Sequence, residues 1–353
     1  MMTLNELLNL TVEKKASDLH LTVDAPPILR IDGELVYINS NKLSSLETNQ
    51  YVKEILNNED DYKKYIDKGE IDISYSIDSI GRFRVNIFKQ KGTDSLAIRY
   101  ISSKIPTLEE LKFPPIIKEL TLKQRGLILV TGPTGSGKST TLAAMINEIN
   151  LSKAVHIITL EDPIEYLHSH HKSIINQREI GKDSISYQNA LKHILREDPD
   201  VILVGEMRDL ETISIAITAA ETGHLVFSTL HTIGAAKTID RIIDVFPPHA
   251  QTQIRIQLAS VIQGIISQQL IPNAFGGGRT AALEIMIGTP AIQNLIREGK
   301  THQIESSIQT GIKYGMKTMD MALAELCKKG IINNATAEDY AIDKNIFKKM
   351  IMF

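Results

Sequence analysis

Residues 132 to 139 read Gly132-Pro133-Thr134-Gly135-Ser136-Gly137-Lys138-Ser139 and match the phosphate-binding pattern G-x-x-x-x-G-K-[ST] at every fixed position. The apolar run 127–130 precedes them directly, and the helix-forming stretch 140–145 follows. A buried strand that enters a glycine-rich turn and then a helix directs backbone N–H groups and a helix N-terminus at one anion-sized space. The pattern predicts a nucleoside-triphosphate site; the plainer alternative is a glycine turn that happens to precede a helix.

The residue types in this loop suit a nucleotide bound with a metal ion. We expect Lys138 against the β- and γ-phosphates and the Ser139 hydroxyl on Mg²⁺, while the glycines allow φ values that a side chain forbids. ATP and Mg²⁺ are therefore the expected ligands. The residues expected to bind the nucleotide are Gly132, Pro133, Thr134, Gly135, Ser136, Gly137, Lys138, Ser139 and Thr140.

Composition narrows the class of protein. A chain of 353 residues suggests two domains. Apolar content of 42%, charged content of 23% and a net charge of −3 match neither a disordered chain nor a nucleic-acid binder. Cys327 is the only cysteine, so no internal disulfide and no Cys-based zinc site can form, which fits the cytosol.

Hydrophobic patterning gives no sign of a membrane segment. The start of the chain lacks a basic region followed by a continuous apolar core, and no later apolar run approaches the length that spans a bilayer. We expect no direct membrane insertion, so any work at a membrane would go through partner proteins.

The first hundred residues combine a helix with short strands. Apolar residues at helical spacing indicate an opening helix over 4–12. The expected strands are residues 19–22, 28–31, 71–75, 82–88 and 95–100. This pattern predicts a small α+β domain over 1–101, followed by a serine- and proline-punctuated linker over 102–115 and a second domain over 116–353.

The second domain has the alternation of an α/β protein. Near-continuous apolar runs at 127–130, 155–160, 201–204 and 225–229 are typical of parallel strands buried on both faces. From about Pro248 onward the chain is predicted to be mainly helical, with Ile254, Leu258, Val261, Ile262 and Ile265 on one helix face. A Gly276-Gly277-Gly278 turn, interpreted as a flexible hairpin, interrupts this region.

Two acidic residues follow strands of this sheet. Glu161 comes directly after 155–160, and Glu206 follows 201–204 after one glycine. Ligands of open α/β sheets bind at the carboxyl ends of the strands, so both are placed to act on a nucleotide. We expect one to polarise the attacking water and Glu206 to help hold Mg²⁺. The alternative for each is a solvated turn carboxylate.

Histidines occur at two further places. His224 and His231 lie at the two ends of the strand 225–229, which favours a γ-phosphate contact by one of them over a purely structural role. His168, His170 and His171 have the spacing of metal ligands but lie in a polar connector, where a solvated loop is the preferred interpretation.

These segments together resemble a known family. Residues 196–209 are similar to the Walker B region of secretion ATPases, residues 159–165 to their aspartate box, and residues 222–232 to their histidine box. The resemblance extends to residues 16–22 and 26–33 in the first domain and to 295–304 near the end. The resemblance covers nearly the whole chain, and the family that the chain resembles is the PilT-type pilus retraction ATPases.

The resemblance carries its own expectations. It implies a PAS-like N-terminal domain, a RecA-like ATPase domain and a homohexameric ring. It also implies a motor that disassembles a type IV pilus. The implied partner is an inner-membrane platform protein, and the implied location is the inner face of the cytoplasmic membrane. In the family, arginines of the N-terminal domain reach the triphosphate, and Arg82, Arg84 and Arg99 match them by position. Without the resemblance, an arginine on an alternating strand is an exposed charge.

The chain departs from the family in one motif. The family's retraction-linked segment begins Ala-Ile-Arg-Asn-Leu, whereas this chain has Gln293 in place of the arginine, between Ala291 and Leu295. Glutamine can donate a hydrogen bond but cannot form the ion pair of an arginine. The departure concerns coupling to retraction and leaves the nucleotide site intact.

Three other readings compete with retraction. A pilus extension or type II secretion ATPase shares the same boxes, but those proteins carry a paired CxxC zinc element that one cysteine cannot form. A regulatory ring subunit without hydrolysis would not need the complete set of Lys138, Ser139, Glu161 and Glu206. A nucleic-acid translocase is disfavoured by the slightly acidic charge.

Overall fold

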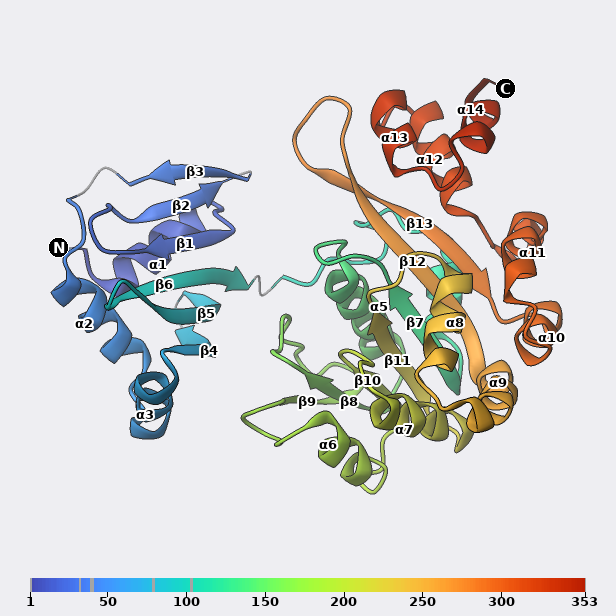
Figure 1. Ribbon diagram of the computed structural model, residues 1–353, viewed down its shortest axis with the longest axis horizontal. Helices are drawn as coiled ribbons and strands as arrows, with labels where there is room; N and C mark the ends of the chain where they lie inside the picture. The colour runs from blue at the N-terminus through green and yellow to red at the C-terminus, as the bar shows by residue number, and fades with distance from the viewer. Residues whose placement is uncertain (1, 32, 39–40, 78–79, 102–103, 353) are drawn as a thin grey trace. The chain divides into compact units, whose positions relative to one another are not determined.

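The computed structural model describes residues 2–31, 33–38, 41–77, 80–101 and 104–352. Its internal contacts divide the chain into two compact units, Met1–Lys104 and Ile105–Phe353. Each unit has its own sheet and its own hydrophobic core (Figure 1).

The first unit is built on a six-stranded sheet with the order β3-β2-β1-β6-β5-β4, in which neighbours run antiparallel. Its strands are β1 (Asp18–Leu21), β2 (Ile28–Ile31), β3 (Glu34–Tyr37), β4 (Glu70–Ile77), β5 (Gly81–Gln90) and β6 (Thr93–Ile101). Its helices are α1 (Leu4–Glu13), α2 (Ser45–Ile55) and α3 (Glu59–Lys68). The helices pack on one face of this sheet, where apolar strand residues such as Leu19, Val85 and Ile98 join α1 and α2 in a single core.

Of the three helices in this unit only α1 was predicted, and α2 and α3 were not. The opening helix begins where Thr3 and Glu6 form a reciprocal cap, with the Thr3 N–H donating to the Glu6 carboxylate at 2.8 Å. The strand β3 was not predicted. Its residues are all exposed, including Leu35 and Tyr37, so it lacks the alternation that marks a half-buried strand.

The second unit is built on a seven-stranded sheet with the order β13-β12-β7-β11-β10-β8-β9. The strands are β7 (Gly126–Thr131), β8 (His156–Glu161), β9 (Ile174–Glu179), β10 (Val201–Val204), β11 (Leu225–Leu230), β12 (Ile262–Pro272) and β13 (Arg279–Ile287). The pairs from β12 to β9 are parallel, and β13 runs antiparallel to β12. The carboxyl ends of β7, β8, β10 and β11 therefore meet at one edge.

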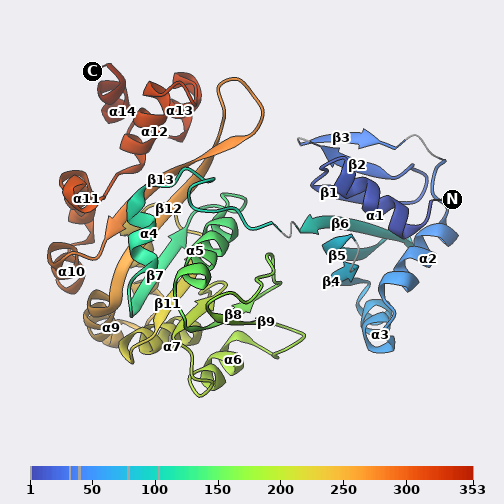
Figure 2. The same cartoon turned by 180° about the vertical axis from the view of Figure 1, so that it is seen from behind.

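Helices cover both faces of this sheet. One face carries α4 (Pro115–Thr121) and α5 (Lys138–Ser152), as Figure 2 shows. The other face carries α6 (Tyr187–Ile194), α7 (Leu210–Glu221), α8 (Ala235–Asp244), α9 (Pro248–Val261), α10 (Pro290–Arg297) and α11 (Ile304–Thr310). This double cover explains why the four predicted strands read as continuous apolar runs.

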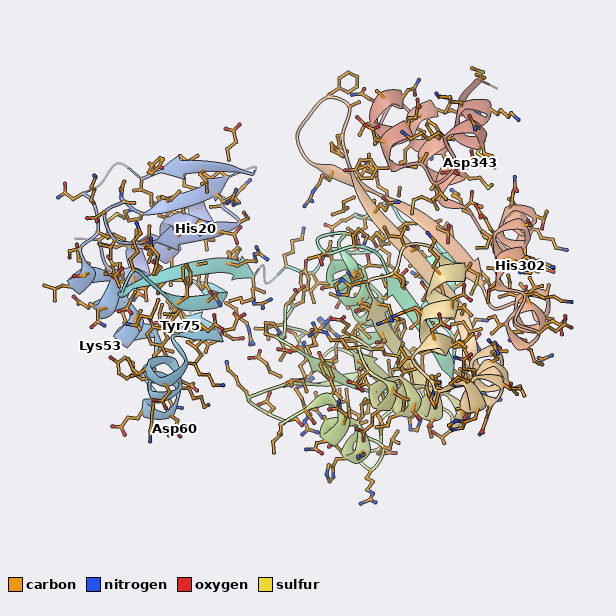
Figure 3. The ribbon with its side chains drawn as sticks, viewed as in Figure 1. His20, Lys53, Asp60, Tyr75, His302 and Asp343 are labelled. Carbon is orange, nitrogen blue, oxygen red and sulfur yellow. The ribbon has the colours of Figure 1, made fainter. Side chains whose placement is uncertain are left out.

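The C-terminal residues form a smaller cluster on the β12–β13 hairpin. It contains α12 (Met319–Lys328), α13 (Asn334–Tyr340) and α14 (Lys344–Met352), preceded by two short 3₁₀ turns, η1 (Thr301–Gln303) and η2 (Ile312–Tyr314). Asp343, labelled in Figure 3, accepts hydrogen bonds from the N–H groups of Asn345 and Ile346 at the start of α14.

The prediction of a mainly helical region after Pro248 was wrong for residues 262–287. α9 ends at Val261, and Ile262 and Ile265 belong to β12, which pairs with β7 inside the sheet. An apolar run buried on both faces of a sheet has the same composition as a buried helix, so periodicity alone does not separate them. The Gly276-Gly277-Gly278 turn connects the two strands, with φ of 75°, 74° and 124°.

The segment expected as a linker is only partly one. Residues 102–103 lie outside the described residues, and residues 105–115 belong to the second unit. Leu108 is buried there beside Ile117 and Leu120 of α4. In the part of the chain that the structure describes, no helix combines the length and apolar character needed to cross a bilayer.

Candidate nucleotide-binding site

The loop between β7 and α5 has the geometry that its glycines predict. Gly132, Gly135 and Gly137 have φ of 139°, 77° and 88°, in the region that disfavours residues with a Cβ. A Cβ on Gly132 would also lie 2.2 Å from the carbonyl oxygen of Gln268 on β12. α5 begins at Lys138, immediately after the loop. Strand, turn and helix thus follow one another in the predicted order.

Lys138 is held against its own loop. Its Nζ donates hydrogen bonds to the carbonyl oxygens of Gly132 at 2.8 Å and Pro133 at 3.0 Å. Burial lowers the pKa of Lys138, while the nearby carboxylates of Glu206 and Glu165 act in the opposite direction. A partly desolvated cation among backbone dipoles interacts more strongly with an anion than an exposed lysine does.

Several hydroxyls border the loop. Ser136 Oγ and Thr131 Oγ1 are buried and have no hydrogen-bond partner among the described residues. Ser139 and Thr140 lie in the first turn of α5, where Thr140 Oγ1 is 2.9 Å from the Tyr166 hydroxyl. Buried polar atoms without partners are uncommon in folded proteins. They fit a loop whose hydrogen bonds are completed by a polar ligand.

Glu161 ends β8 at the same sheet edge. Its Oε1 accepts hydrogen bonds from the Thr159 hydroxyl at 2.7 Å and from Gln177 Nε2 at 3.2 Å. Burial raises the pKa of Glu161 despite these two hydrogen bonds, which favour the charged form. The result is an oriented carboxylate with raised basicity, as a group that takes a proton from water requires.

Glu206 lies in the loop that follows β10, two residues beyond its last residue. The N–H of Gly205 donates to Leu160 O at 2.8 Å, which brings the end of β10 beside the end of β8. One oxygen of Glu206 is 2.8 Å from Arg208 Nε and the other is 3.3 Å from His231 Nε2. The second ring nitrogen of His231 is 3.4 Å from Thr134 Oγ1 in the loop. His231 therefore bridges Glu206 and the phosphate-binding loop.

His224 is not brought to this place. It precedes β11, whereas the loop follows the carboxyl end of the parallel strand β7, so His224 lies at the opposite edge of the sheet. Its Nδ1 is 2.9 Å from Ala219 O at the end of α7. Of the two histidines considered at the sequence level, His231 alone has the geometry for a phosphate contact within one chain.

The three arginines matched in the first unit lie together on one face of its sheet. Arg84 is directly opposite Arg99 across β5 and β6, and Arg82 alternates onto the same side, away from the helices. Their hydrogen-bonding partners include Ser74 for Arg82 at 3.0 Å, Asp72 for Arg84 at 2.9 Å and Asp18 for Arg99 at 2.8 Å. Their role at a nucleotide stays a prediction.

The polar face that bears these arginines also contains a histidine. His20, labelled in Figure 3, is two residues from Asp18 on β1 and so shares its side of the sheet. Burial lowers the pKa of His20; the Asp18 carboxylate opposes this shift, and Arg30 and Arg99 add to it. This face therefore combines arginines with the carboxylates of Asp18 and Asp72, and His20 is favoured in its neutral form.

The histidine triplet shapes the connector before β9. The N–H of His168 donates to Gln177 Oε1 at 2.8 Å, and His170 Nδ1 accepts from the N–H of Ile175 at 3.1 Å. Burial lowers the pKa of His168 to about 4. Among the described residues no group of three or more His, Cys, Asp and Glu could hold a metal ion.

A metal ion that takes few protein ligands still suits the loop. Mg²⁺ at a nucleotide keeps several waters and uses one or two protein groups besides the phosphates. Ser139 in the first turn of α5 and Glu206 at the end of β10 supply oxygen donors of the type it prefers. The donor set therefore fits Mg²⁺ held mainly by phosphate and water.

The segment that resembles the retraction motif begins in α10 and continues through η1 to the first residue of α11. Ile292 and Ile296 are buried against the core, whereas Asn294, Arg297 and Glu298 are exposed. Asn294 Nδ2 donates to Glu298 Oε1 at 2.8 Å. The helix thus packs through its apolar side and presents a polar one.

Sequence reasoning missed several groups around the two carboxylates. Arg208 lies two residues after Glu206, and its charge was a signal that could have been used. Gln177 lies opposite Thr159 in the pair formed by β8 and β9, and from there it reaches Glu161. No local sequence pattern reveals this pairing. A Cβ on Gly205 would lie 2.8 Å from the Tyr187 hydroxyl, so glycine precedes Glu206 for steric reasons.

Comparisons with known proteins show which proteins this chain resembles. The family model "Type II/IV secretion system protein" matches residues 1–337. The chain is 50% identical over 342 residues to the "Type IV pilus retractation ATPase PilT" of Pseudomonas aeruginosa, covering 96% of this chain and 98% of that protein. It is also 50% identical over 306 residues to a "Twitching motility protein" of Neisseria gonorrhoeae, covering 87% and 82%.

A solved structure agrees in fold as well. The crystal structure of "the Pilus Retraction Motor PilT and Bound ADP" superposes with a TM-score of 0.93 at 46% identity, covering 99% of this chain and all of that one. This confirms the predicted α/β fold, a RecA-like ATPase domain preceded by a smaller domain. The chain belongs to the type II/IV secretion system protein family and, within it, to the PilT-type ATPases.

Proposed function

We propose that this chain is a Mg²⁺-dependent ATPase motor that powers type IV pilus retraction, and so twitching motility, by pilus disassembly. The observation that carries the proposal is the convergence of Lys138, Glu161, Glu206 and His231 at one edge of the second sheet. The names of the two relatives at 50% identity support retraction as the work that hydrolysis performs.

The residues divide the chemistry among them. The loop amides and Lys138 bind the triphosphate, and bound Mg²⁺ offsets the negative charge on its β- and γ-phosphates. Glu161 accepts a proton as water attacks the γ-phosphorus and the bond to the bridging oxygen breaks, which leaves ADP and phosphate. His231, between Glu206 and Thr134, is placed to respond when the γ-phosphate leaves.

Motor action requires that hydrolysis alter the arrangement of units. We infer that the chains form a homohexameric ring and that Arg82, Arg84 or Arg99 completes a nucleotide site through movement of the first unit. The predicted partner is an inner-membrane pilus platform protein, reached from the cytoplasmic side. The proposal involves neither nucleic acid nor direct membrane insertion.

Deletion of the gene in its native host, with pili counted by electron microscopy, tests the direction of the motor. Surplus surface pili, lost again on complementation with the wild-type gene, support retraction. Complementation with Lys138→Ala, which removes the phosphate-binding cation, is the matched control and is expected to leave the surplus in place. Missing pili in the deletion strain would instead identify an extension or assembly ATPase.

A further inference from the structure

Gln268 lies beneath the phosphate-binding loop, although 132 residues separate it from the loop in sequence. It stands on β12, which pairs with β7 so that Ser267 is opposite Thr131, the last residue before the loop. The side chain is buried, with 2% of its surface exposed. A buried carboxamide must satisfy its donors and its acceptor within the protein.

Both ends of this carboxamide are engaged. Nε2 of Gln268 donates to the carbonyl oxygen of Ser136 at 2.6 Å, and Oε1 accepts from the Thr141 hydroxyl at 2.7 Å. The Ser136 carbonyl can only accept, so the nitrogen must face the loop and the oxygen must face α5. One side chain therefore joins the loop to the first turn of the helix that follows it.

The contact also orients a backbone donor. In a planar trans peptide the C=O of Ser136 and the N–H of Gly137 point in opposite directions. When Gln268 holds the carbonyl toward β12, the Gly137 N–H is aimed away from β12. A Cβ on Gly137 would lie 2.8 Å from Nε2 of Gln268, so the glycine is what allows this approach.

We propose that Gln268 is a positioning residue for nucleotide binding, which sets the direction of the Gly137 N–H without contacting the nucleotide. The inference rests on the proposed nucleotide site and adds to it a residue from a strand that carries no nucleotide motif. Glycine is required at 137 by the side chain of Gln268, whereas Gly132 packs against the backbone carbonyl of the same residue.

Three variants of the full chain test this role by ADP titration, steady-state hydrolysis and thermal unfolding. Gln268→Met keeps the volume and removes both hydrogen bonds; ADP affinity is expected to fall about tenfold, the effect of losing one well-placed buried hydrogen bond. Thr141→Val removes only the bond to α5 and is the matched control, with ADP affinity expected within about threefold of wild type.

Gln268→Glu adds a readout that a purely structural role would not produce. Its carboxylate repels the Ser136 carbonyl at neutral pH, whereas the protonated carboxyl can donate to it. The ratio of variant to wild-type ADP affinity is therefore expected to rise as pH falls. If Gln268→Met does not fold, the pH dependence of Gln268→Glu still tests the positioning role.

The outcomes separate the two claims. Equal loss of affinity in Gln268→Met and Thr141→Val, wild-type affinity in Gln268→Met, or a pH-independent ratio for Gln268→Glu would overturn the positioning role while wild-type ADP binding stands. Failure of the wild-type chain to bind ADP would overturn the nucleotide site itself and this inference with it.

Discussion

Nε2 of His231 lies 3.3 Å from Oε1 of Glu206, and the opposite ring nitrogen lies 3.4 Å from Thr134 in the phosphate-binding loop. One imidazole thus spans the end of β11, the end of β10 and the loop. We therefore expect a change in charge at the loop to alter the contact between His231 and Glu206.

If the His231 ring responds to the leaving γ-phosphate, as we propose, its replacement by alanine should lower turnover more than ADP affinity. Steady-state hydrolysis and ADP titration measure the two effects. His224→Ala is the matched control: it removes the contact with Ala219 O at the opposite sheet edge and should reduce stability with little effect on turnover. Equal turnover in the two variants would remove His231 from the chemistry.

Lys138→Ala should abolish hydrolysis and leave the fold intact. The Nζ donates to two carbonyls of its own loop, and burial lowers the pKa of Lys138. Its loss therefore relieves a desolvation cost while removing the cation that the phosphates need. Phosphate release and the thermal unfolding midpoint are the measurements. Near-wild-type turnover would contradict the assignment of the loop.

Glu161→Gln should slow turnover by on the order of a hundredfold, as loss of a proton acceptor does, with nucleotide affinity retained. The amide oxygen can still accept from Thr159 and Gln177. Glu206→Gln should slow turnover similarly and also remove the ion pair with Arg208, which the first substitution leaves untouched. Turnover close to wild type in Glu161→Gln would exclude it as the base.

The same Glu161→Gln variant should differ from wild type in the pH dependence of its stability. Burial raises the pKa of Glu161 in the folded state, so its ionisation destabilises the fold above that raised pKa, and the cost disappears as pH falls below the unfolded carboxyl pKa. The variant should therefore unfold at a higher temperature than wild type near pH 8, with the difference vanishing in acid. A difference that persists in acid would mean that the effect is not electrostatic.

Alanine at Arg82, Arg84 or Arg99 should lower turnover more than ATP affinity if one of them completes a nucleotide site. Arg30→Ala is the matched control, because Arg30 lies opposite Asp18 on the same sheet face and donates to Gly33 O. Mixing mutant and wild-type subunits shows whether activity follows the ring or the single chain. Full activity in all three variants would exclude the first unit from the chemistry.

Substitutions on the polar side of α10 should separate hydrolysis from retraction. Alanine at Asn294, Arg297 and Glu298 spares the buried Ile292 and Ile296, since a buried large-to-small change alone costs about 2–5 kcal/mol. Retained hydrolysis and ring assembly with lost retraction would establish coupling through this helix. Unchanged retraction in every variant would leave α10 as ordinary structure.

The phosphate-binding loop and the strands around it could be predicted because each depends on neighbours in sequence. A glycine turn needs only its own φ values, and a strand buried on both faces needs only an apolar run. The positions of Glu161 and Glu206 followed from these strands, since parallel strands bring their carboxyl ends to one edge. The similarity of the Walker B region, the aspartate box and the histidine box to those of secretion ATPases then indicated the family.

What the tertiary structure decided is which distant side chains meet at that edge. Gln177 reaches Glu161 and Gln268 reaches Ser136 because β9 and β12 pair with β8 and β7, and pairing between strands far apart in sequence has no local signature. Residues 262–265 were predicted as helix for a related reason. An apolar run suits a buried strand or a buried helix equally, and only the pairing of β12 with β7 distinguishes them. The sequence did not distinguish His224 from His231 as candidates. The structure does, because they lie at opposite ends of β11 and the phosphate-binding loop is at only one of these ends.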